Sequence, residues 1–133
     1  MNRRALLVLA ALFSFALLVI IGCGGGGGGS NPTNPGGGGP TFDLHFPATN
    51  ASQSFTFTAN GTWAYHCTPH GTQTSGMHGE VVVAAASAND SALVIVGDNN
   101  TLTFTPSSVT IKTGGTVRWV NESSMTNHTV TRP

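Results

Sequence analysis

Residues 65–83 read YHCTPHGTQTSGMHGEVVV and place a thiol, an imidazole and a thioether within one short segment. The three side chains are those of Cys67, His70 and Met77. Soft sulfur and imidazole, with methionine as a weak axial donor, form the ligand set of trigonal copper sites that use one cysteine and two histidines. Pro69 stiffens the turn between Cys67 and His70, so both can face one point. The segment therefore supplies all but one imidazole of such a site.

Short strand patterns surround this segment. Their β-branched and aromatic residues lie in runs bounded by Gly, Pro and Asn turn residues. The predicted strands are 54–59, 62–66, 80–84, 92–96, 102–105, 108–112, 116–120 and 128–131. About eight short strands at this spacing, without a helical period, predict an all-β fold, namely a Greek-key β-sandwich or barrel. The first candidates for its core are Trp63, Trp119 and the phenylalanines, and Leu102 is expected on the same strand face as Phe104.

Cys67 and His70 are also compatible with other chemistries. A lone cysteine is more often a buried small hydrophobic residue than a ligand, and zinc accepts the same sulfur and imidazole donors. A nucleophilic pair made of Cys67 and His70 would need an orienting acid and an oxyanion element, and neither is recognisable nearby. The sequence therefore disfavours hydrolase chemistry and predicts that the protein is not an enzyme.

The segment resembles the copper-binding loop of the cupredoxins, in particular that of plastocyanin and pseudoazurin. That loop reads Y-x-C-x-P-H, a spacer and G-M-x-G-x-V-x-V, as residues 65–83 do here with a longer spacer than in plastocyanin. Residues 55–65, FTFTANGTWAY, look like the strand pair that precedes the loop in the family. The resemblance implies one type 1 copper ion, held by Cys67, His70, a second histidine and an axial Met77.

In the family, the second histidine comes before the cysteine loop, after a strand that ends in W-x-N. Here the corresponding pattern comes last in the chain, where residues 116–121 read TVRWVN and His128 lies within NHTV. This reversed order predicts a circularly permuted cupredoxin domain over residues 41–133, with 84–92 as the linker across the former termini. Permutation is tolerated where termini are close and the new break is an exposed loop. The competing interpretation is a truncated tandem array, with one half-domain from each copy.

Residues 1–22 predict a secretory signal. Arg3 and Arg4 precede an apolar stretch, and Ile20-Ile21-Gly22-Cys23 resembles a bacterial lipobox, in which Cys23 carries the lipid. The alternative is an uncleaved anchor with an incidental cysteine. Residues 23–40 are rich in Gly and Pro and predict a flexible tether. We therefore expect a lipid-anchored protein of the bacterial cell envelope, on its periplasmic or extracellular face.

Charge excludes one class of partner. Only 8% of the residues are charged and the formal net charge is zero, so the chain offers no basic face for nucleic acid. If Cys23 carries lipid, Cys67 is the only remaining cysteine and an intrachain disulfide cannot form.

These patterns favour a lipid-tethered carrier of single electrons, because the metal's donors leave no position for a substrate. The resemblance implies a redox protein as partner, either a cytochrome or a membrane oxidase or reductase, which would dock at the exposed edge of His70. A monomer is expected. His45, His66 and His78 are expected outside the ligand set. Two alternatives stay open, a periplasmic copper-binding or delivery module and a metal-free structural β-sandwich.

Overall fold

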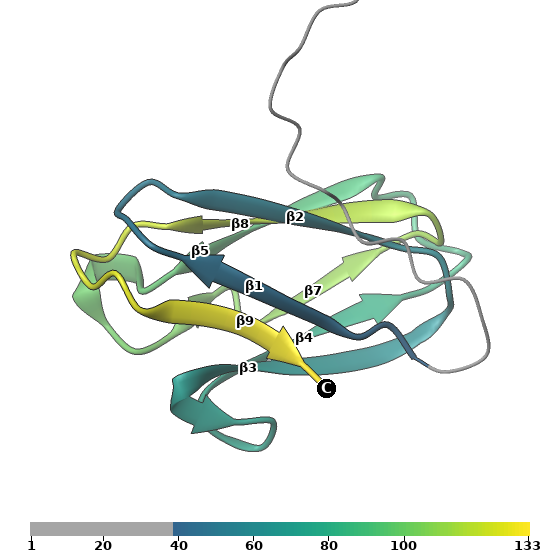
Figure 1. Ribbon diagram of the computed structural model, residues 1–133. Helices are drawn as coiled ribbons and strands as arrows, with labels where there is room; N and C mark the ends of the chain where they lie inside the picture. Colours follow the sequence, from purple (N-terminus) through teal and green to yellow (C-terminus); the bar gives the residue numbers. More distant parts are fainter. Residues whose placement is uncertain (1–38) are drawn as a thin grey trace, which may run out of the picture.

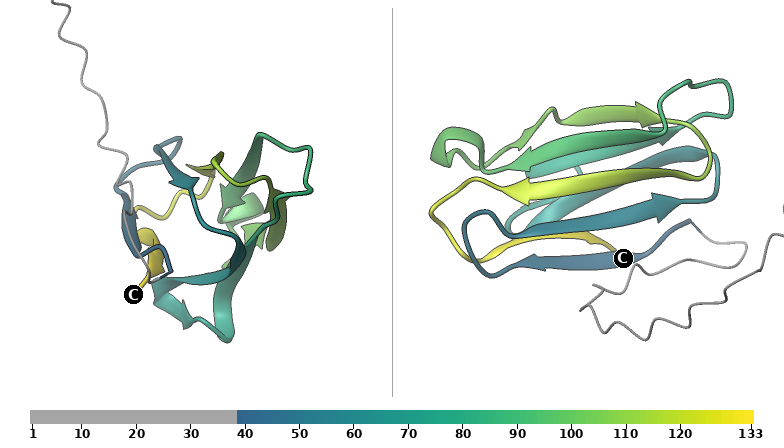
Figure 2. Two further views of the ribbon diagram at one scale, coloured as in Figure 1. Left: turned by 90° about the vertical axis from the view of Figure 1, so that its right-hand side faces the viewer. Right: turned by 90° about the horizontal axis from the view of Figure 1, so that it is seen from above.

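Two mixed β-sheets pack against each other in the computed structural model, which describes residues 39–133 (Figure 1; Figure 2). The five-stranded sheet has the order β1-β9-β3-β4-β7, and the four-stranded sheet has the order β2-β8-β5-β6. The strands are β1 (Phe42–Phe46), β2 (Ser52–Phe57), β3 (Gly61–Thr72), β4 (Ser75–Val83), β5 (Ser91–Val96), β6 (Phe104–Thr105), β7 (Ser108–Ile111), β8 (Gly115–Asn121) and β9 (His128–Arg132). The predicted all-β sandwich is confirmed.

Strand β1 was not predicted from the sequence. Its residues FDLHF alternate between buried and exposed, with Phe42, Leu44 and Phe46 in the core and Asp43 and His45 outside. The alternation is typical of a half-buried strand, but it lasts for only five residues and includes Asp, a residue that is depleted in strands. Pairing with β9 over the full length of β1 provides the tertiary support that the local sequence lacks.

The core between the sheets is built on aromatic rings. Trp119 of β8 is fully buried, and its ring centroid lies 5.5 Å from that of Tyr65, 6.0 Å from that of Phe42 and 6.4 Å from that of Phe57. Burying each such ring contributes about 1.5–3 kcal/mol. Because Trp119 comes from the second half of the domain and its three partners from the first, the core joins the two halves.

Leu102 does not lie where the strand pattern predicts, and Trp63 packs against the core without being fully buried. Leu102 lies outside β6 and is 46% exposed, so it does not share a strand face with Phe104. The turn that follows β5 includes a short 3-10 segment, Asp98–Asn100, and strand structure resumes only at Phe104. Trp63 is partly buried at the edge of the core, where the Arg132 guanidinium lies 5.2 Å from the centre of its ring.

Both sheets contain strands from both halves of the domain. In the first sheet β9 lies between β1 and β3, and β7 pairs in parallel with β4. In the second sheet β8 pairs antiparallel with β2 and in parallel with β5. The two halves therefore complete one sandwich, as a permuted domain requires, although the permutation itself stays a prediction. The connection from β4 to β5 covers most of the predicted linker 84–92, whose last two residues belong to β5.

The predicted signal at residues 1–22, the lipidation site Cys23 and nearly all of the predicted tether lie outside the described residues. Within the described part of the chain, no helix has the length and hydropathy needed to span a bilayer.

Candidate metal centre

A bulge in the β3–β4 hairpin positions Cys67 and His70. Paired residues run along the two strands as far as His66 opposite His78, and pairing resumes with Gly71 opposite Gly76. Residues 67–70 therefore bulge out of the ladder. Bulges bend a strand and re-aim its side chains. The segment predicted as a loop between two strands is thus largely strand, with a local irregularity that carries the cysteine and the histidine.

Glycines allow the two strands to approach each other beside this bulge. Gly76 has a φ of +71°, and a Cβ placed there would lie 2.5 Å from the His70 carbonyl oxygen. A Cβ at Gly71 would lie 2.5 Å from the Met77 backbone nitrogen. Because no larger residue fits without a backbone shift, the two glycines fix the geometry of the hairpin where His70 is attached.

Strand β9, which begins at the left in Figure 1, carries His128 to the cluster from the second half of the chain. His128 is the first residue of β9, where it pairs with Phe46, and it is 1% exposed. The preceding connection is held by Asn121, whose side-chain amide donates to the Met125 carbonyl at 3.0 Å and whose side-chain oxygen accepts the Ser123 N–H at 3.0 Å. The conformation of this connection places His128 beside the bulge that carries Cys67 and His70.

Cys67, His70 and His128 form one cluster that is arranged to hold a metal ion. The Cys67 Sγ lies 3.2 Å from His70 Nδ1 and 3.6 Å from His128 Nδ1, and the ligand atoms all lie within 4.8 Å of one another. Both imidazoles present Nδ1 to the sulfur, and their ring centroids are 4.9 Å apart. One thiolate and two imidazoles form the donor set that suits copper. No other cluster of three such donors occurs in residues 39–133.

Burial disfavours the charged forms of the two buried donors of this cluster, Cys67 and His128. Burial raises the pKa of the Cys67 thiol, and the Thr129 N–H, which donates to Sγ at 3.3 Å, opposes that rise only in part. Burial and the neighbouring His70 lower the pKa of His128. Cys67 would coordinate a metal cation as the thiolate, because a coordinating thiol is deprotonated outright. Metal binding at Cys67 therefore releases a proton.

The other sequence candidates lie as follows. Met77 is 1% exposed on β4 beside the bulge, and its axial role stays a prediction. His66 alternates with buried neighbours on β3, while His78 is exposed and its Nδ1 lies 2.8 Å from the Gly76 carbonyl oxygen. His45 is exposed on β1. None of these three histidines joins the cluster.

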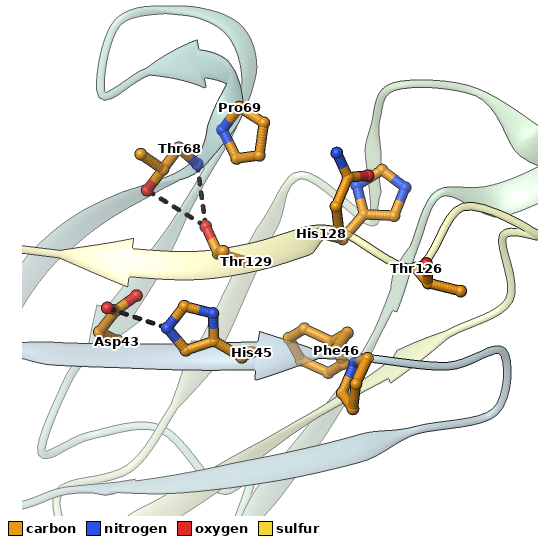
Figure 3. A pocket seen from close by; sticks show the side chains of 10 residues that line it. Asp43, His45, Phe46, Thr68, Pro69, Thr126, His128 and Thr129 are labelled. Atoms are coloured by element: carbon orange, nitrogen blue, oxygen red, sulfur yellow. Dashed lines mark hydrogen bonds and ion pairs between the residues drawn. The ribbon is translucent and has the colours of Figure 1, made fainter.

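Sequence analysis missed two groups that surround the cluster. Thr68 and Thr129 follow Cys67 and His128, and the Thr68 N–H donates to Thr129 Oγ1 at 2.9 Å (Figure 3). Gly97 lies against the ring of His128, where a Cβ would be 3.1 Å from Nε2. No local pattern marks these residues, because their contacts join segments far apart in the chain.

A groove of about 540 Å³ opens beside the cluster, lined by residues of β1, β3 and β9 and of the connections next to them, and Figure 3 shows the side chains that line it. Its lining includes His128, Thr129 and Pro69 on one side and Phe46 and Pro47 on the other. The metal centre therefore lies next to a surface depression that is mostly apolar.

Comparison with known proteins found a family match for the first half of the domain only. Residues 43–84 match the family described as copper binding proteins, plastocyanin/azurin family. Searches of curated proteins and of solved structures found no match. The match covers the hairpin that carries Cys67 and His70, and the structure adds His128 to the same cluster. Over residues 43–84 the chain is therefore similar to the plastocyanin/azurin family of copper-binding proteins, and its Cys/His/His cluster is consistent with a type 1 copper site of the cupredoxins.

Proposed function

We propose that this protein is a lipid-tethered carrier of single electrons, with one type 1 copper ion as its redox centre. The observation that carries the proposal is the convergence of the Cys67 sulfur with the Nδ1 atoms of His70 and His128 within 4.8 Å. The coarser conclusion, a copper-binding protein of a family of electron carriers, follows from the family match and this cluster.

The chain's own part in this function is to keep the donors in place. Copper held by this donor set supplies a one-electron couple between Cu(I) and Cu(II). β9 is hydrogen-bonded to β1 on one side and to β3 on the other, so the backbones that carry Cys67 and His128 are fixed to each other. Donors that stay in place limit the rearrangement between oxidation states, and small rearrangement favours fast electron transfer.

The exposure of the two imidazoles supports a route for electrons through His70. His128 is buried, whereas His70 is partly exposed and follows the exposed Pro69. His70 is therefore the donor nearest to solvent. We expect a redox protein, either a cytochrome or a membrane oxidase or reductase, to dock over this edge.

The tether belongs to the same proposal. A signal at residues 1–22, a lipid on Cys23 and a flexible segment over residues 23–40 would hold a monomeric domain at the bacterial cell envelope, on its periplasmic or extracellular face. Such a carrier can reorient between a donor and an acceptor in the same membrane.

Copper titration of the full chain tests the redox centre. We expect one Cu(II) ion per chain, an intense thiolate-to-copper absorption band in the visible region and a reversible voltammetric wave. Cys67→Ser exchanges one atom of the side chain and should abolish the band. Stoichiometric copper binding without the band, or no binding at all, would contradict the proposal.

Two further measurements test its other parts. A copper-delivery module uses the same donors but must release the metal, so rapid loss of copper to a mild chelator would favour delivery over electron transfer. Cys23→Ser should release the protein from the membrane fraction without changing the absorption band. Retention of this variant in the membrane would contradict lipid attachment at Cys23.

A further inference from the structure

Asp43 lies outside the metal cluster but is connected to it by hydrogen bonds. It faces solvent on β1, where the register places it opposite Thr131 and places His45 opposite Thr129. The Thr131 hydroxyl donates to Asp43 Oδ1 at 2.7 Å. On the other side, the His45 Nε2 lies 3.1 Å from Asp43 Oδ2 (Figure 3). Both carboxylate oxygens therefore have partners, and one of these partners leads inward.

The inward path consists of Thr131, Thr129 and Thr68, which we call the threonine network. The Thr131 hydroxyl oxygen lies 2.9 Å from that of Thr129 and 3.1 Å from that of Thr68. The Thr68 N–H donates to Thr129 Oγ1 at 2.9 Å, and the Thr129 N–H donates to the Cys67 sulfur at 3.3 Å. The network thus ends at two backbone N–H groups of residues that directly follow Cys67 and His128.

The charge of Asp43 fixes the direction of these bonds. A carboxylate can only accept, and each threonine hydroxyl has one hydrogen to donate. Thr131 gives its hydrogen to Asp43, so its oxygen is left to accept from the Thr68 hydroxyl. The Thr129 hydroxyl accepts the Thr68 N–H and donates its own hydrogen to the Thr68 hydroxyl oxygen, which lies 3.3 Å away. One ionised carboxylate at the surface thereby sets the orientation of three hydroxyls.

We propose that Asp43 is a positioning residue of the metal centre, which acts through the threonine network on the two backbone segments that flank the sulfur. Its effect on the bound metal rests on the proposed function. The network itself exists without copper, so it can be tested separately.

Amide hydrogen exchange in the copper-free full chain provides the first test. In Thr131→Val, which keeps the shape of the side chain, we expect the Thr68 amide to exchange about tenfold faster than in the wild type. In Asp43→Asn we expect a smaller acceleration, because the amide can also donate and no longer fixes the direction of the network. The double variant should exchange no faster than Thr131→Val alone, because both changes interrupt one path.

Glu122→Gln is the matched control, since it removes the same charge from an exposed residue outside the network. It should leave the Thr68 amide unchanged, and the amide of the buried Val94 should keep its protection in every variant. Equal exchange of the Thr68 amide in the wild type, Asp43→Asn and Thr131→Val would overturn the proposal.

The reduction potential of the copper-loaded chain separates positioning from a purely structural role. Thr131→Val keeps the Asp43 charge, so a change of potential in this variant arises through the network. We expect a lower potential, because a loosened N–H bond leaves the thiolate more electron-rich. Faster amide exchange with an unchanged potential would overturn the positioning role. If the wild type shows no thiolate-to-copper band, the proposed function fails, while the exchange data still decide whether the network exists.

Discussion

The two halves of the sandwich contribute unequally to the metal centre. Residues 42–83 supply Cys67 and His70 from one hairpin and coincide with the family match, which ends at residue 84. Residues 91–132 supply a single imidazole, that of His128, more than sixty positions away from Cys67. A hairpin motif can be recognised within a short window of sequence. A donor that arrives through the fold can be assigned only when the pairing of distant strands is known.

The largest effect is expected from removing the second half's only donor. His128→Ala should lower copper affinity by more than about 100-fold and abolish the thiolate-to-copper band, because loss of a ligand exceeds the loss caused by an outer-shell change. The exposed His78, which lies outside the cluster, provides the control His78→Ala, and we expect it to bind copper as the wild type does. Competition titration measures both affinities. Unchanged affinity in His128→Ala would show that the first half binds the metal alone.

The next effect tests whether the two halves depend on one core. Trp119→Ala should lower the free energy of unfolding by about 3–5 kcal/mol, because the ring packs on three aromatic residues of the first half. Leu93 is 52% exposed on the neighbouring β5, and Leu93→Ala should cost less than about 0.5 kcal/mol. Urea unfolding of the copper-free protein measures both. Equal costs would mean that the halves pack independently.

Much of the fold could be predicted from the alternation of residues along the strands. All eight predicted strands overlap structural strands, and five of them have a similar length, because β-branched and aromatic runs ended by turn residues carry a local signal. The short strand β1 was missed because its stability comes from pairing with β9. Leu102 was placed wrongly because the turn after β5 extends further than its Gly and Asn residues indicate.

The residues of the metal site also divide into those that could be predicted from the sequence and those that could not. Cys67 and His70 were predictable from their spacing, because one bulge of one hairpin carries both. His128 was proposed only through the resemblance to a permuted family member, since no spacing rule links it to Cys67. The threonine network and Gly97 depend on the register of β9 with β1 and β3 and on the position of the turn after β5. No local sequence pattern contains that information.

A pair of glycine variants tests whether the second half of the domain fixes the position of the His128 imidazole. Gly97 and Gly114 have φ values of +70° and +81°, so alanine at either position should cost about 1–2 kcal/mol of stability from backbone strain. Only Gly97 has close neighbours, since its Cβ would lie 2.5 Å from Ser123 Cβ and 3.1 Å from His128 Nε2, whereas a Cβ at Gly114 meets nothing within 4 Å.

We therefore expect Gly97→Ala to lower copper affinity about tenfold by displacing the imidazole of His128, and Gly114→Ala to leave affinity unchanged. Competition titration measures the affinities, and urea unfolding checks that both variants remain folded. Equal copper affinities in the two variants would show that the position of His128 does not depend on Gly97.

The smallest effect is the pH dependence of the copper-free protein, in which the two halves act on opposite sides of neutrality. Burial and the nearby His70 lower the pKa of His128 below its ordinary 6.5. As pH falls through 6.5, the unfolded chain takes up a proton that the folded chain does not yet bind. The free energy of unfolding should therefore decrease on the acid side until the folded pKa is passed.

Above neutral pH, groups in the first half of the domain determine how the free energy of unfolding changes with pH. Burial raises the pKa of Cys67 above its ordinary 9.0 and raises that of Tyr65 from 10.0 to about 12, so the unfolded chain releases these protons first. Stability should be highest between pH 6.5 and pH 9.0 and should fall as pH rises beyond that range. Urea unfolding across this range measures the profile. Because His128→Ala removes only the acid-side group and Cys67→Ser only one alkaline-side group, each should flatten its own limb. A variant that flattened the opposite limb would contradict this assignment of the two limbs to the two halves.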